Sequence, residues 1–146
     1  MGATMHGACL CGAVSFEAEP ERPEVHACHC EMCRRWAGSA LLCVSVKADA
    51  IRFEGAEHIE RFRSSDWAER AWCGRCGSTL YYHLTDGAPE EQRYEMAMGL
   101  FDRPDDFTLT LEIFSDCRPA CLAFAGERRT KTRAEVLASF AGEGSA

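Results

Sequence analysis

Alternation of apolar and polar residues is the dominant pattern of the chain between residues 13 and 114. Short runs in which every second residue is apolar are typical of β-strands with one buried face. Turn-forming pieces rich in proline, glycine and acidic residues separate these runs. The pattern therefore predicts an all-β, mainly antiparallel fold. The predicted strands cover residues 13–19, 39–47, 50–55, 59–64, 79–84, 94–101 and 108–114.

The end of the chain has a helical pattern instead. Thr132 is followed three residues later by Glu135, which is the spacing of a capping box at a helix N-terminus. Val136 and Phe140 then recur at the spacing of one helix face. We expect a short C-terminal helix over residues 133–141.

Length and composition indicate a single globular domain spanning residues 1–146. The chain has 146 residues, of which 47% are hydrophobic, enough for a core that needs no disulfide support. Its formal charge of −7 argues against nucleic acid as a partner. The apolar runs are far shorter than the roughly 20 residues that cross a bilayer. The N-terminal residues lack an apolar signal segment, so we expect a cytoplasmic protein without membrane contact.

The ten cysteines change this picture, because seven of them form three closely spaced groups. The groups are a C-x-C followed by glycine, a C-x-C-x-x-C, and a C-x-x-C followed by glycine. On an extended strand, the two thiols of a C-x-C point the same way. The two sulfurs of a C-x-x-C converge in a tight turn that the glycine permits. The groups are Cys9 and Cys11; Cys28, Cys30 and Cys33; and Cys73 and Cys76.

These spacings favour two zinc sites. A structural zinc needs four ligands, and two clamps from distant segments supply them, although spacing alone does not say which clamps meet. Pairing the first clamp with the last leaves a set of three cysteines, which is how a reactive zinc with an open position is usually held. His29 lies between two of these ligands, and strand alternation predicts that it points away from their metal. The expected ligands are Cys9, Cys11, Cys73 and Cys76 for the structural zinc, and Cys28, Cys30 and Cys33 for the second.

Other interpretations of the cysteines stay open at this point. A redox C-x-x-C at residues 73–76 would normally sit in a parallel βαβ context, which the strand pattern lacks. Disulfides are disfavoured in a reducing compartment. The set of three could be a second closed structural site, completed by Cys117, Cys121 or a histidine. Otherwise we expect Cys43 to be a buried core thiol, and packing to be the default role of Cys117 and Cys121.

The order of these segments resembles the glutathione-dependent formaldehyde-activating family, which also includes centromere protein V. The resemblance runs from about residue 7 to about residue 119. The segments that carry it are "GACLCGAV", "CHCEMCRRWAGS", "WCGRCGSTLYY", "MGLFDRPDDF" and "EIFSDCRPA". It implies an Mss4-like, all-β "tent" fold with two Zn²⁺ ions, distributed over the same two sets of cysteines.

The resemblance also implies an activity, the condensation of formaldehyde with glutathione to S-(hydroxymethyl)glutathione, or in reverse a carbon–sulfur lyase. Glutathione or a similar small thiol is therefore the expected partner. The chain departs from the family at two positions near the predicted site. Glu112 stands where members often carry a histidine, and Cys121 where they often carry a tryptophan.

The residues themselves suggest how such a reaction would be supported. We expect a substrate thiol to take the open position on the second zinc, because three thiolates make the metal a poor activator of water. Arg34 and Arg35 would offset the thiolate charge or receive a substrate carboxylate. The alternatives to a lyase are a non-catalytic glutathione carrier and a scaffold module that binds zinc only for structure.

Overall fold

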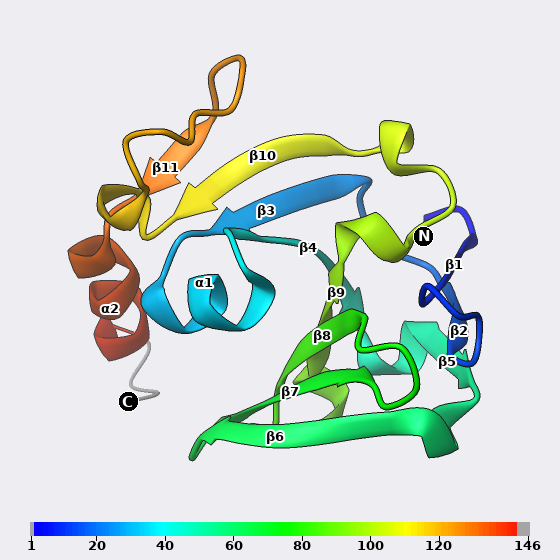
Figure 1. Cartoon of the computed structure of the whole chain (residues 1–146). Helices are drawn as coiled ribbons and strands as arrows, with labels where there is room; N and C mark the ends of the chain where they lie inside the picture. The colour runs from blue at the N-terminus through cyan, green and yellow to red at the C-terminus, as the bar shows by residue number, and fades with distance from the viewer. Residues whose placement is uncertain (1, 143–146) are drawn as a thin grey trace. The chain divides into compact units, whose positions relative to one another are not determined.

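The computed structural model describes residues 2–142, and for residues 141 and 142 only the backbone (Figure 1). Strands dominate it, most of them paired antiparallel, and the α-helices of this part of the chain are α1 (Glu31–Ala37) and α2 (Arg133–Gly142). The prediction of a mainly antiparallel β fold with a short C-terminal helix is confirmed. The strands are β1 (Met5–Ala8), β2 (Ser15–Ala18), β3 (Glu24–Cys28), β4 (Leu41–Lys47), β5 (Ile51–Glu54), β6 (Ile59–Ser65), β7 (Ala68–Cys73), β8 (Thr79–Leu84), β9 (Arg93–Ala97), β10 (Thr108–Ile113) and β11 (Arg129–Lys131).

The chain divides into two compact units, each built from two segments. Unit 1 contains Met1–Glu24 and Cys43–Thr108, and unit 2 contains Val25–Leu42 and Leu109–Ala146. No helix in the described part of the chain has both the length and the apolar character needed to cross a membrane.

Unit 1 consists of antiparallel strands around an aromatic core. β2 pairs with β1 on one side and with β5 on the other, while β9, β8, β7 and β6 follow one another beside β4. Phe16 packs edge-on against Phe101, with ring centroids 5.1 Å apart, and Tyr81 packs in the same way against Tyr94 at 4.7 Å. Leu80 and Met96 are fully buried, as expected for the inward faces of central strands.

Unit 2 places a small group of strands beside two helices. β10 lies between β3 and β11, and it pairs with β11 in parallel (Figure 1). α2 begins with the predicted capping box. The backbone N–H of Glu135 donates to the Thr132 hydroxyl at 3.2 Å, and the Glu135 carboxylate accepts from the Thr132 N–H at 3.0 Å.

Four strands, β1, β3, β7 and β11, escaped the prediction, and in β7 and β3 the reason is that the sequence does not alternate clearly. β7 reads "AERAWC", yet Arg70 is buried, and its guanidinium lies 4.8 Å from the centre of the Tyr82 ring. A charged residue in a short run reads as solvent-facing from sequence alone. β3 is only five residues long and directly follows a turn-rich piece, so its pattern is too short to identify.

Candidate metal centres

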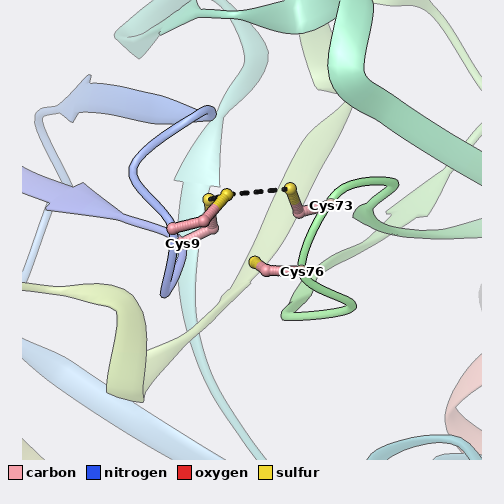
Figure 2. Close-up of side chains that lie close together, drawn as sticks. Cys9, Cys73 and Cys76 are labelled. Carbon is pink, nitrogen blue, oxygen red and sulfur yellow. Dashed lines mark hydrogen bonds between the residues drawn. The ribbon is translucent and has the colours of Figure 1, made fainter.

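Cys9, Cys11, Cys73 and Cys76 come together in unit 1, with sulfurs that all lie within 4.8 Å of one another. The Cys9 and Cys11 sulfurs are 3.7 Å apart, and those of Cys11 and Cys73 are 3.9 Å apart. Four thiolates at about 2.3 Å from a tetrahedral Zn²⁺ are separated by roughly 3.8 Å. Figure 2 shows the sulfur of Cys9, on one loop, facing the sulfurs of Cys73 and Cys76, which both lie on another loop. The site thus has the donors and spacing that a tetrahedral zinc requires.

Two glycine turns bring these sulfurs together. Gly12 follows the first clamp at φ 79° and Gly77 follows the second at φ 78°, a backbone region that glycine adopts without strain. The Gly12 N–H donates to the Cys9 carbonyl at 3.1 Å, and the Gly77 N–H to the Cys73 carbonyl at 2.8 Å. Cys9 and Cys11 therefore lie in a turn after β1, so the reason given above for their convergence, alternation along a strand, is wrong for this clamp.

Ser78 links the two clamps, a role that the sequence did not reveal. Its hydroxyl accepts a hydrogen bond from the Leu10 N–H at 3.0 Å and lies 3.2 Å from the Cys76 sulfur. Residues that hold metal ligands in place contribute strongly to metal affinity. A serine after a C-x-x-C-G turn has no distinctive sequence signal, because serine is common in turns for many reasons.

The thiols of Cys76 and Cys11 have very different pKa values because their surroundings differ. Bonds with the Ser78 hydroxyl and backbone lower the pKa of the Cys76 thiol to about 5. At Cys11 a backbone hydrogen bond from Ala13 lowers the pKa, but loss of solvation and the neighbouring sulfurs raise it to about 11. Sulfurs packed this closely disfavour one another's ionisation, because neighbouring thiolates repel. A bound cation would offset that repulsion and hold all four sulfurs as thiolates, the form that ligates a metal.

The second group, Cys28, Cys30 and Cys33, forms in unit 2 where β3 passes into α1. Cys28 is the last residue of β3, and Cys30 is the N-cap of α1, where its sulfur accepts a hydrogen bond from the Cys33 N–H at 3.3 Å. The His29 N–H donates to the Ile113 carbonyl at 3.2 Å, which anchors the connection to the end of β10. The neighbouring sulfurs and burial raise the pKa of the Cys28 thiol.

Within the described residues, the group contains three ligands and no more. All three sulfurs lie within 4.8 Å of one another, and no histidine, carboxylate or further cysteine of the described chain joins them. Cys117 and Cys121, the cysteines considered as a fourth ligand, are exposed and lie outside the group. Their exposure also argues against a packing role. All ten cysteines are free, and Cys43 is buried as predicted.

His29 takes part in a buried network instead of the cysteine group. Its Nε2 lies 2.8 Å from one oxygen of Glu112, and Arg128 donates to the other oxygen at 2.7 Å. The three side chains are between 0% and 8% exposed. Burial alone would raise the pKa of Glu112, but the hydrogen bonds from His29 and Arg128 outweigh it, so that pKa is lowered.

The sequence pattern concealed this network. Glu112 falls on the polar side of the alternation in β10, together with Thr108 and Thr110, which reads as a solvent face. Both its carboxylate oxygens are nevertheless paired in unit 2. Two features of the sequence could have revealed the network. Glu112 is an acidic residue near the apolar end of a strand, and it stands at a position where the chain departs from the family pattern.

A pocket of about 220 Å³ lies in unit 2, next to the residues that carry the second cysteine group. His29 and Arg34 contribute to its lining, together with the loop at 38–40 and three residues of the segment 119–122, including Cys121. Arg34 and Arg35 therefore differ. Arg34 faces the pocket, whereas Arg35 donates to the Glu31 carboxylate at 2.9 Å on an exposed helix surface.

Comparisons with known proteins agree with the resemblance seen in the sequence. The family model described as "Glutathione-dependent formaldehyde-activating enzyme" matches residues 4–117. A protein of Schizosaccharomyces pombe named as an uncharacterized lyase is 34% identical over 133 residues, which are 91% of this chain and 94% of the relative. The matched range contains both groups of cysteines.

Proposed function

The chain belongs to the glutathione-dependent formaldehyde-activating family, and from this premise we propose that it is a zinc-dependent carbon–sulfur lyase. Its proposed substrates are adducts of a small thiol with an aldehyde, such as S-(hydroxymethyl)glutathione. The S. pombe relative is itself named as a lyase. The free state of all ten cysteines suits a reducing compartment, and we propose a cytoplasmic location.

The observation that carries this proposal is the three-membered cysteine group in unit 2. Cys28 and Cys33 are buried, whereas Cys30 is partly exposed, so the group is accessible on the Cys30 side. A zinc ion on these three thiolates would supply an open position that favours sulfur over water. The residues are thus suited to holding a substrate sulfur, and less suited to hydrolysis.

The other group has a different proposed role. Cys9, Cys11, Cys73 and Cys76 would close a structural zinc site with no position left for a substrate. Zinc bound in this way contributes roughly 10–16 kcal/mol of apparent binding energy, against a total stability of about 5–15 kcal/mol for an ordinary domain. Unit 1 should therefore depend on this metal for its fold.

The reaction needs few further groups. In the cleavage direction, the hydroxyl group of the adduct gives its proton to water and the carbon–sulfur bond breaks. The bonding electron pair stays on the sulfur, and the aldehyde leaves. The positive charge of Arg34, next to Cys33 in the chain, favours the thiolate that results. The condensation direction runs the same steps backwards.

The proposal is tested by measuring adduct formation from glutathione and formaldehyde against the uncatalysed rate, for example by exchange spectroscopy. The zinc-loaded protein should accelerate both formation and cleavage, and Cys30→Ala should lose the acceleration because the group then has two ligands. Cys117→Ala is a matched control, since Cys117 is exposed and outside the group. Equal rates with and without protein, together with saturable glutathione binding, would identify a carrier instead of a lyase.

A further inference from the structure

Strand β6 leaves one edge of unit 1 without a partner strand. It is seven residues long, and within residues 2–142 β7 is the strand that pairs with it. Figure 1 shows β6 as the outermost of the strands β8, β7 and β6. The pairing with β7 is regular from Ile59 to Arg63, and an irregularity follows between Arg63 and Ser65. The alternate N–H and C=O groups on the outer side of residues 59–63 are therefore open to a further strand.

The side chains of β6 differ from those of an edge strand that is only protected against pairing. Charged residues, proline and bulges blunt such edges, and Arg61 and Arg63 fit that purpose. Phe62 lies between them and is 61% exposed, while Trp67, in the turn to β7, is 52% exposed. Aromatic side chains are enriched on surfaces where proteins bind one another. The edge therefore has the composition of a binding surface.

Alternation along β6 separates its positive charge from its aromatic ring. Successive side chains of a strand point to opposite faces, so Arg61 and Arg63 share one face and Phe62 lies on the other. All three residues are exposed. Arg61 lies 3.5 Å from the Glu69 carboxylate, whereas Arg63 donates to the Asp66 carbonyl and pairs with no carboxylate of the described residues. A strand added beside β6 would meet two arginines on one face and a phenyl ring on the other.

A second copy of the chain does not suit this edge. When two β6 strands pair antiparallel about a two-fold axis, directly opposite residues lie on the same face and interact. Registers centred on residue 60 or 61 place Glu60 opposite Glu60 or Arg61 opposite Arg61. Registers centred on residue 62 or 63 place Arg61 opposite Arg63 or Arg63 opposite Arg63. Each of these registers opposes like charges, which is unfavourable, so the edge favours a different chain.

We propose that β6 binds an extended segment of a partner protein that carries an acidic, an apolar and an acidic residue in succession. The acidic side chains lie opposite Arg61 and Arg63, and the apolar side chain lies opposite Phe62. Strand addition of this kind draws affinity from main-chain hydrogen bonds and specificity from alternate side chains. The surface belongs to unit 1, whereas the three-cysteine group and the pocket belong to unit 2. The proposal is thus independent of the lyase activity.

Two fluorescently labelled peptides test this proposal on the zinc-loaded wild-type protein. One is Thr-Thr-Glu-Val-Glu-Thr-Thr, and the other has lysine in place of both glutamates. Anisotropy should show that the acidic peptide binds roughly tenfold more tightly, because two opposite-charge pairs replace two like-charge pairs. The formal charge of −7 on the whole chain would by itself favour the basic peptide. Equal affinities, tighter binding of the basic peptide, or no saturable binding of either would overturn the proposal.

Methylated peptides separate strand addition from simple attraction between charges. In an added strand, alternate N–H groups face the neighbouring strand. N-methylation of the valine and N-methylation of the glutamate that follows it should therefore have unequal effects. One change should abolish binding of the acidic peptide, and the other should leave most of it. Equal effects of the two changes would overturn the proposal. These measurements use unaltered protein, so they do not depend on a variant that folds.

Protein variants then locate the contact on β6. Arg63→Glu should remove most of the preference for the acidic peptide, and Phe62→Thr, which keeps a high strand propensity, should weaken the binding of both peptides. Arg103→Glu is the matched control, because it makes the same change of charge at an exposed arginine outside β6. Equal effects of Arg63→Glu and Arg103→Glu would overturn the proposal. Wild-type dimers that Arg63→Glu disrupts would also overturn it, because they would identify a second copy as the occupant.

Discussion

The most consequential single residue outside the cysteines is Glu112. It receives hydrogen bonds from His29 at 2.8 Å and from Arg128 at 2.7 Å, in surroundings that exclude most solvent. Removing one member of a buried charge pair leaves the other without compensation, which costs more than the pair contributes. Arg128 would be that stranded charge, because its side chain is only 7% exposed.

Glu112→Gln is therefore expected to lower the free energy of unfolding by about 3–5 kcal/mol at neutral pH. The matched control is Glu31→Gln, whose exposed pair with Arg35 should contribute less than about 1 kcal/mol. Urea unfolding of both variants checks the difference. Similar losses in the two variants would mean that the buried pair has no special role.

Glu112 also makes the free energy of unfolding depend on pH. The pKa of Glu112 is lowered from its ordinary value of 4.5, so folding favours the ionised carboxylate that faces His29 and Arg128. Its contribution is present above the ordinary value and is lost as the pH falls through the lowered folded-state pKa. Glu112→Gln should therefore flatten the acid side of the stability profile, and an unchanged acid slope would contradict this.

At the scale of elements, turns contribute more than strands to the positions of the cysteines in the candidate metal sites. The sequence predicted seven of the strands and the C-terminal helix, because long alternating runs and a capping box are local signals. It also grouped the cysteines as the structure does. It did not reveal Ser78, the Glu112 network or the pocket. These depend on which segments meet in space, and a single sequence holds no local record of that.

Gly77→Ala tests the importance of the turn geometry. At φ 78° a Cβ atom meets no neighbour within 4 Å, so the change adds backbone strain without a steric clash. The expected loss is roughly 1–2 kcal/mol in the free energy of unfolding. Gly99→Ala is the control, because its Cβ also meets no neighbour and its φ is not in the left-handed region. Thermal unfolding of the zinc-loaded proteins measures both, and an equal effect would show that the left-handed turn is not required.

At the scale of the whole molecule, the proposed structural zinc site and the proposed substrate-binding zinc site lie in different compact units. The four-cysteine group lies in unit 1 and the three-cysteine group lies in unit 2, together with the pocket and the buried network. We propose that a single domain holds both. A closed site suits a structural zinc, and an incomplete site beside a pocket suits a substrate sulfur. Loss of the two metals should therefore have different consequences.

The most direct test of this division is the zinc content per folded chain of the wild type, Cys76→Ala and Cys30→Ala. Wild-type protein should hold two zinc ions, and Cys30→Ala should stay folded with one, because only the open group is disrupted. Cys76→Ala should unfold, since a structural zinc contributes roughly as much energy as the whole domain retains. One zinc in the wild type, or equal destabilisation of both variants, would contradict the assignment of one structural and one open zinc site.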